Sequence, residues 1–168
     1  GENKDRDENY SYKEMPYNGF WNILFYDTKT KEIHLLTEKK AMILEYDYKY
    51  NRGKGINIPK KLNHIFYEVR INDFNKDKLI NQKDPIYLFV SDKKGKNFRQ
   101  ISPKNYSLYD WSYIESSNKI IITAIKDSNK NLQFDNKDEV STFELVLDSN
   151  EQPQEIFDND LKTKLKLQ

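Results

Sequence analysis

The sequence predicts an all-β protein built from antiparallel strands. Most apolar residues occur in short bursts separated by Asn, Asp, Lys and Gly, and the chain is rich in aromatic residues, with 12 Tyr and 9 Phe. Short bursts rich in β-branched and aromatic residues are typical of strands joined by turns, and no stretch sustains a helical period. The expected strands cover 20–26, 32–37, 41–48, 64–71, 86–91, 97–101, 107–113, 119–125, 140–147 and 154–157.

The length of 168 residues predicts one domain with a sizeable core. Residues 1–18 form a charged, apolar-poor segment that we expect to be a flexible arm, so the domain is expected to span 19–168. The final stretch, 161–168, alternates Leu with polar residues, and this alternation favours a strand.

The charge balance argues against nucleic acid as a partner. The 28 basic residues are nearly matched by 27 acidic ones, which leaves a net charge of +1 and no global field to attract a polyanion. The chain has no cysteine, which excludes disulfides and thiolate-bound metals, and it has no apolar run long enough for a transmembrane segment.

An internal repeat organises the chain. The segment 71–102 resembles 125–157, and each consists of an Asp/Asn-rich loop, a strand that ends in aspartate, a short turn and a second strand. A third copy of the hairpin lies at 22–37, where Asp27 takes the place of Asp92 and Asp148. Aspartate at the start of a turn commonly accepts backbone N–H groups, so we expect a structural role for these three residues.

The segment 87–125 resembles the repeat of TolB-type β-propellers. The residues that carry this resemblance are Asp92, Gly95, Ile101, Ser102, Asp110, Trp111 and Ser112. The family continues with Pro-Asp-Gly, whereas this chain has Tyr113-Ile114-Glu115. The resemblance implies antiparallel four-stranded propeller-type blades, with an inner strand near 107–113 and an outer strand near 97–101, and a packing role for Trp111 between blades.

The chain is expected to contain about two complete blades, 41–101 and 107–157, and a third assembled from 20–37 and 161–168. Closed propellers have four to eight blades, so three blades leave open edges. Three arrangements remain open: strand 161–168 returns to the N-terminal hairpin, two chains pair as a homodimer into an oligomer-completed ring, or one chain forms an open partial β-propeller.

The two Asp/Asn-rich loops, 73–84 and 127–138, match the ligand spacing of an EF-hand calcium loop. Such loops supply oxygen ligands from positions 1, 3, 5, 7, 9 and 12, with a backbone carbonyl at position 7. The expected ligands of the first loop are Asp73, Asn75, Asp77, the Leu79 carbonyl, Asn81 and Asp84. Those of the second loop are Asp127, Asn129, Asn131, the Gln133 carbonyl, Asp135 and Asp138.

Both loops depart from the EF-hand pattern, so any calcium binding is expected to be weak. Position 6 is Lys78 or Leu132 in place of glycine, although position 8 keeps an apolar residue, Ile80 or Phe134. Three aspartates oppose three lysines in the first loop and two in the second, for net charges of zero and −1. These features predict dissociation constants on the order of 10⁻⁴–10⁻³ M. The alternative is that Asp and Asn only hydrogen-bond the loop backbone, without metal.

Catalytic motifs are missing from the sequence. The chain has two histidines, His34 and His64, and no nucleophile elbow, zinc-binding helix motif or phosphate-binding glycine loop. A glycosidase would need two converging carboxylates, for which Glu68, Asp110 and Glu115 are the candidates.

Together these features predict a non-catalytic binding or scaffolding module of the cell envelope. The expected partner is a protein or an envelope glycan, and the alternative function is a carbohydrate-active hydrolase that uses a carboxylate pair. The chain begins with Gly1, typical of a trimmed chain, which favours an exported periplasmic protein or an outer-membrane lipoprotein.

Overall fold

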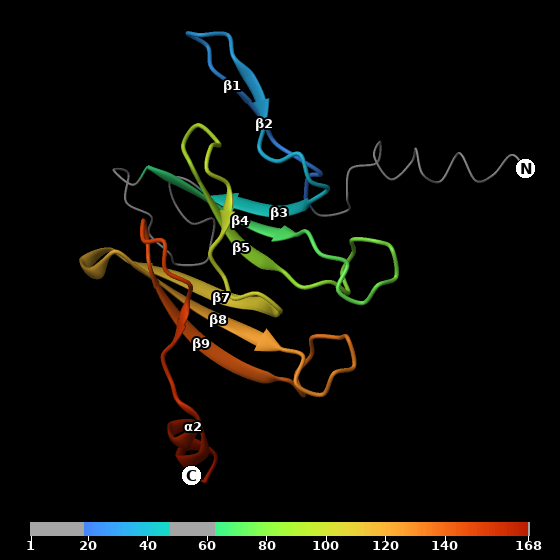
Figure 1. The fold of residues 1–168 in the computed structure, drawn as a ribbon, viewed down its shortest axis with the longest axis vertical. Helices are drawn as coiled ribbons and strands as arrows, with labels where there is room; N and C mark the ends of the chain where they lie inside the picture. The colour runs from blue at the N-terminus through green and yellow to red at the C-terminus, as the bar shows by residue number, and fades with distance from the viewer. Residues whose placement is uncertain (1–18, 48–62, 168) are drawn as a thin grey trace, which may run out of the picture.

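The computed structural model describes residues 19–47 and 63–167, which form three antiparallel sheets stacked in chain order (Figure 1). The N-terminal hairpin pairs β1 (Leu24–Tyr26) with β2 (Ile33–Leu35). The middle sheet contains β3 (Met42–Asp47), β4 (His64–Arg70), β5 (Tyr87–Asp92) and β6 (Arg99–Gln100). The C-terminal sheet contains β7 (Tyr106–Ile114), β8 (Lys119–Lys126), β9 (Glu139–Val146) and β10 (Gln154–Glu155), with the short 3₁₀ helix η1 (Glu115–Ser117) between β7 and β8.

The two four-stranded sheets occupy the expected segments 41–101 and 107–157 and have the same topology. In each sheet the strands lie side by side in chain order, and the last strand is only two residues long. The first strand of each sheet carries a register shift, between Ile43 and Glu45 in β3 and between Leu108 and Asp110 in β7. The described residues are thus mostly β, and they form no closed barrel or propeller.

The middle sheet is covered on both faces, because alternate residues of its strands pack in opposite directions. On β5, Leu88 and Val90 belong to the core shared with the C-terminal sheet, whereas Tyr87 and Phe89 belong to the core shared with the N-terminal hairpin. Buried on both faces, β5 reads as a continuous run of buried residues rather than an alternating pattern.

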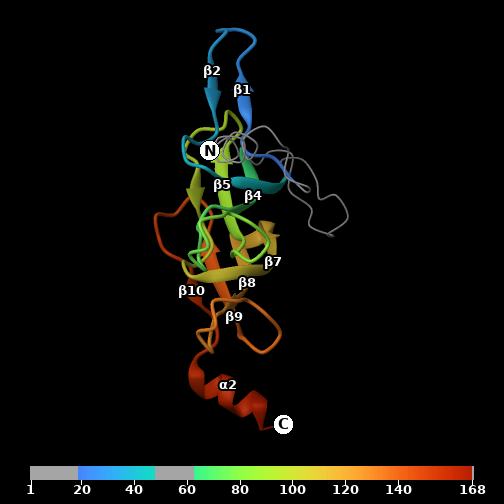
Figure 2. The same ribbon diagram turned by 90° about the vertical axis from the view of Figure 1, so that its right-hand side faces the viewer.

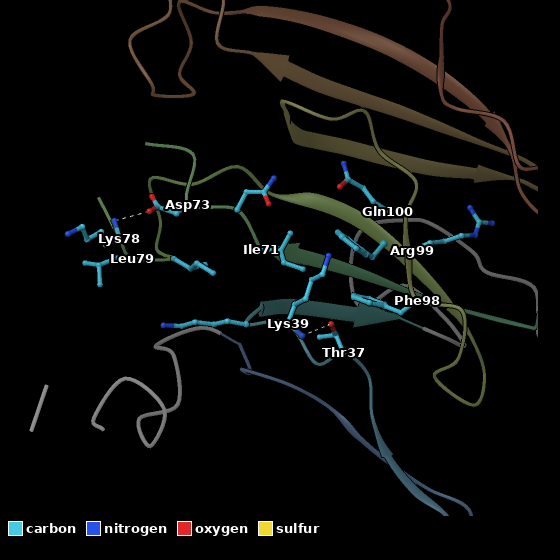
Figure 3. A pocket seen from close by; sticks show the side chains of 13 residues that line it. Thr37, Lys39, Ile71, Asp73, Lys78, Leu79, Phe98, Arg99 and Gln100 are labelled. Carbon is cyan, nitrogen blue, oxygen red and sulfur yellow. Dashed lines mark hydrogen bonds between the residues drawn. The ribbon is translucent and has the colours of Figure 1, made fainter. Parts of the chain in front are cut away.

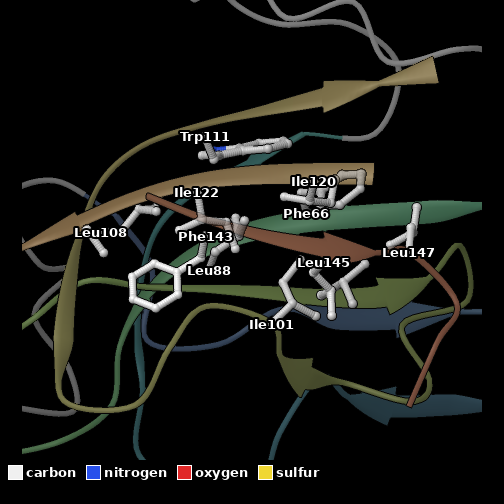
Figure 4. Close-up of a cluster of buried hydrophobic side chains, with 12 residues drawn as sticks. Phe66, Leu88, Ile101, Leu108, Trp111, Ile120, Ile122, Phe143, Leu145 and Leu147 are labelled. Atoms are coloured by element: carbon white, nitrogen blue, oxygen red, sulfur yellow. The ribbon is translucent and has the colours of Figure 1, made fainter. Parts of the chain in front are cut away.

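The core between the middle and C-terminal sheets contains Trp111 (Figure 4). Its ring lies 4.9 Å from that of Phe66, and its Nε1–H donates a hydrogen bond of 3.3 Å to Glu68 Oε1 on β4. Trp111 therefore packs between two sheets, as expected of this residue, and the hydrogen bond gives its polar nitrogen a partner inside the core.

Residues 161–167 do not form a strand, and the prediction that 161–168 completes a third blade is wrong. Residues Asn159–Lys166 form helix α2, which Figures 1 and 2 show at the far end of the stack from the N-terminal hairpin. Asp158 caps the helix by accepting the Leu161 N–H at 2.8 Å. Leu161 and Leu165 share one helical face at i, i+4 spacing, a pattern that outweighs the local alternation of Leu and Lys. The predicted arm, 1–18, lies outside the described residues.

Candidate metal-binding loops

The two candidate loops lie at equivalent places in the two four-stranded sheets. Loop 73–84 connects β4 to β5, and loop 127–138 connects β8 to β9, so each joins the second and third strands of its sheet. Both loops project from the same side of the stack (Figure 1). Phe74 of the first loop and Phe134 of the second contact each other with ring centroids 4.9 Å apart. The loops are therefore neighbours in space as well as repeats in sequence.

The aspartate at position 1 closes each loop through its carboxylate. Asp73 accepts the N–H groups of Asp77 at 3.0 Å and Lys78 at 2.8 Å. Asp127 accepts those of Asn131 and Leu132, both at 3.0 Å. The first side chain of each loop thus faces the backbone of positions 5 and 6.

The aspartate at position 12 is buried and holds the other end of each loop. Asp84 accepts the N–H groups of Phe74 and Asn81, both at 2.9 Å. Asp138 accepts the N–H groups of Ser128 at 3.1 Å and Asp135 at 3.0 Å. A carboxylate offers about four lone pairs, so each of these groups keeps acceptor capacity after two such bonds.

Positions 3, 5 and 9 converge in the first loop. The amides of Asn75 and Asn81 both donate to Asp77 Oδ2, at 3.1 and 3.2 Å. In both loops the side-chain oxygens at positions 3, 5 and 9 accept the N–H groups two residues further along the chain. The amide bonds to Asp77 are therefore what the first loop adds to this shared pattern.

The residues at position 6 adopt the backbone conformation that usually requires glycine. Lys78 has φ 69° and Leu132 has φ 61°, and at position 4 Lys76 and Lys130 have φ 60° and 59°. The left-handed region costs a non-glycine residue about 1–2 kcal/mol. Both loops therefore have the same turn geometry at positions 4 and 6, although no glycine is present.

Backbone hydrogen bonds keep two of the carboxylates ionised. The Leu79 N–H, more than any other group, lowers the pKa of Asp77 below its ordinary value. The Asp135 N–H does the same for Asp138, with help from Ser128. Because a lowered pKa favours the charged form, both side chains carry negative charge at neutral pH and well into the acid range.

The donor set of each loop suits a hard, oxygen-preferring cation such as calcium, but it is poor in charge. Carboxylate and amide oxygens are the ligands that calcium takes in proteins. Within residues 19–47 and 63–167, however, no three His, Cys, Asp or Glu side chains gather closely enough to form a metal site. Any site here depends on amide and carbonyl oxygens, which is consistent with the weak binding that the sequence predicts.

A groove of about 760 Å³ lies against the first loop (Figure 3). Asp73, Lys78 and Leu79 of the loop form part of its lining, together with apolar residues such as Ile71 and Phe98. Among the described residues that line it, Lys39, Lys40, Lys78 and Arg99 are basic and Asp73 alone is acidic. The lining of the groove therefore combines apolar side chains with an excess of positive charge.

Two of the three turn aspartates have the expected structural role. Asp27 Oδ1 accepts the N–H groups of Lys29 and Thr30, and Asp92 Oδ1 accepts those of Lys94 and Lys96. Asp148 differs, because its Oδ1 lies 2.8 Å from His64 Nε2 at the start of β4. This contact ties the last turn of the C-terminal sheet to the middle sheet.

The carboxylates considered for catalysis lie on three different elements, β4, β7 and η1. Glu68 faces the core beside Trp111, whereas Asp110, the neighbour of Trp111 on β7, is exposed. Glu115 is exposed in η1.

Ser128 is a loop residue that the spacing argument misses. Its N–H and Oγ–H both donate to Asp138 Oδ1, and its Oγ accepts the Glu139 N–H. The only sequence signal was a small hydroxyl residue directly after position 1, a pattern common to many turns.

Comparisons with protein-family models, curated proteins and solved structures find no match to this chain. In the described part of the chain, no helix is both long and apolar enough to cross a membrane.

Proposed function

We propose that this protein is a non-catalytic binding module of the cell envelope, with two propeller-type blades whose paired loops bind calcium weakly. The observation that carries the proposal is that the first loop also lines the basic groove, through Asp73, Lys78 and Leu79. Calcium bound by this loop would fix the position of the groove wall.

The propeller-type arrangement is supported by the repetition of one sheet topology. Two antiparallel sheets of equal strand order pack face to face and follow each other directly along the chain. The N-terminal hairpin carries the same turn aspartate and packs on the middle sheet in the same chain order.

Calcium would be held by the side-chain and carbonyl oxygens at positions 1, 3, 5, 7, 9 and 12 of each loop. Asp73, Asn75, Asp77, Asn81 and Asp84 would serve the first loop, and Asp127, Asn129, Asn131, Asp135 and Asp138 the second, with the carbonyls of Leu79 and Gln133. Binding on the order of 10⁻⁴–10⁻³ M matches extracellular calcium rather than cytosolic calcium, which supports an exported location, periplasmic or as an outer-membrane lipoprotein.

Thermal unfolding in calcium or chelator tests the metal. At about 5 mM calcium, a site of this affinity adds about 1–2 kcal/mol to the free energy of unfolding, or about 2–8 °C in Tm. Magnesium should raise Tm less than calcium does, because it requires a smaller site with near-octahedral geometry.

Two variants sharpen the calcium test. Leu132→Gly removes the strain at position 6 and should raise Tm in chelator while keeping the calcium shift. Asp127→Asn with Asp73→Asn should abolish the calcium shift and also lower Tm in chelator, because each Asn can accept only one of the two N–H groups that the Asp accepts. An unchanged Tm in calcium for both the parent protein and Leu132→Gly would leave the loops as metal-free turns.

The charge of the groove points to an anionic partner, either an acidic envelope glycan or an acidic protein segment. Binding of acidic and neutral glycans, and of an acidic peptide, can be measured by calorimetry in calcium and in chelator. Lys39→Glu and Arg99→Glu should each lower the affinity for acidic ligands at least tenfold, because each variant reverses one charge of the groove. Equal binding of neutral and acidic ligands would contradict this assignment.

A further inference from the structure

The stack of sheets in the described part of the chain has exposed apolar side chains on both end faces, and the first is the outer face of the N-terminal hairpin. Leu24, Tyr26, Ile33 and Leu35 are 58, 50, 60 and 52% exposed. Leu24 lies opposite Leu35 and Tyr26 opposite Ile33, so all four side chains share one face. The other face, with Phe25, packs on the middle sheet.

The repeat indicates what normally covers this first end face. Three positions before the turn aspartate, Leu24 corresponds to Phe89 and Leu145, which are 7 and 3% exposed. Phe89 packs in the core shared with the hairpin, and Leu145 in the core shared with the middle sheet. In both later repeats, this position is therefore buried against the preceding sheet. Among the described residues, no sheet packs over Leu24, which is 58% exposed.

The second end face is the outer face of the C-terminal sheet, which no following sheet covers in the described part of the chain. The position two residues before the turn aspartate is Phe25 in the first repeat, Val90 in the second and Val146 in the third. Phe25 and Val90 pack against the following sheet, whereas Val146 is exposed, as is Val140 on the same strand. The two end faces are thus the two halves of the interface that occurs twice inside the chain.

The turns of successive sheets are neighbours, because Glu32 of the first turn lies 3.9 Å from Lys96 of the second. The first turn carries two acidic residues, Asp27 and Glu32, and two basic ones, Lys29 and Lys31, whereas the third turn carries Asp148 and Glu151. A second copy stacked in the same direction would bring Lys29 and Lys31 of its first turn beside the acidic third turn.

We propose that the protein self-associates head to tail, with the N-terminal hairpin of one copy packed on the C-terminal sheet of the next. Such an interface is heterologous, because two different surfaces meet, and each copy keeps one free face of each kind until a ring closes. The contact uses neither candidate loop, so it does not depend on calcium.

A mixing experiment tests this geometry. Leu24→Glu with Ile33→Glu blocks the first end face, and Val140→Glu with Val146→Glu blocks the second. All four residues are exposed, so both variants should fold. Sedimentation velocity in chelator should show a concentration-dependent assembly of the parent protein and monomers of each variant. An equimolar mixture should form a two-chain species and nothing larger, because only one unblocked contact remains and the two blocked faces repel.

The matched control is Leu79→Glu with Leu132→Glu, which adds the same charge on the loops at the side of the stack and should assemble like the parent. A parent protein that stays monomeric, or variants that fail to pair when mixed, would overturn the proposal. A monomer that binds anionic lipid vesicles through Lys29 and Lys31 would also overturn it and assign the hairpin face to a membrane surface.

Discussion

The Tyr67 hydroxyl is a polar group inside the core between the hairpin and the middle sheet. Tyr67 is buried, and its oxygen lies 2.7 Å from Ser91 Oγ. Burial raises the pKa of Tyr67 to about 12, although the Ser91 hydrogen bond acts in the opposite direction. The neutral phenol is therefore a component of the folded state.

Alkaline unfolding should report this buried phenol. Because the folded pKa is raised, its contribution to stability is complete below about pH 10 and is lost as pH rises toward 12. Tyr67→Phe should lower the free energy of unfolding by about 0.5–1.5 kcal/mol at neutral pH and reduce its decline above pH 10. Tyr87, whose pKa burial also raises, should contribute to the slope that remains. Urea titrations across this pH range measure both effects, and Tyr109→Phe, at an exposed site, should change neither.

At the scale of elements, Gly95 determines how the hairpin sits on the middle sheet. Gly95 has φ 76°, and a Cβ there would lie 2.4 Å from the Phe25 ring. The turn between β5 and β6 thus approaches the hairpin more closely than any other residue type allows.

Gly95→Ala should therefore loosen the hairpin. We expect a loss of at least about 1–2 kcal/mol from the left-handed backbone alone, and more from the displacement of Phe25. Asn97→Ala is the matched control, since Asn97 has φ 58° in the same turn but is exposed. Hydrogen exchange of β1 and β2 should rise in Gly95→Ala and stay near the parent value in Asn97→Ala. Equal exchange in both variants would show that the Phe25 contact is unimportant.

The sequence was informative about strands and less so about ends of elements. Periodicity and turn residues located the four-stranded sheets, and the repeat located the loops, because both depend on local chemistry. Helix α2 was missed, since the alternation of Leu and polar residues over 161–168 favours a strand; the N-cap Asp158 is a finding of the structure. The Phe74–Phe134 contact and the His64–Asp148 pair depend on how the sheets stack, which no local pattern encodes.

At the scale of the whole molecule, the middle and C-terminal sheets share one core and should unfold together. Phe66 →Ala removes a ring that is 1% exposed and contacts Trp111, which should cost about 3–5 kcal/mol. In a Trp21→Phe background, Trp111 fluorescence and far-ultraviolet circular dichroism should report one coincident transition at a lower Tm. Phe157→Ala, at a more exposed ring, should change Tm little. Two separated transitions would mean that the sheets fold independently.

The edges of the two large sheets restrict how this molecule can meet others. β6 and β10 have two residues each, and β3 and β7 carry register shifts, so no edge offers a long regular row of free backbone groups. Lateral strand addition, the route to fibrous aggregates, is thereby disfavoured on all four sides. Contacts with other chains must therefore form through the side chains on the faces of the sheets. The identity of those side chains then determines which partner binds.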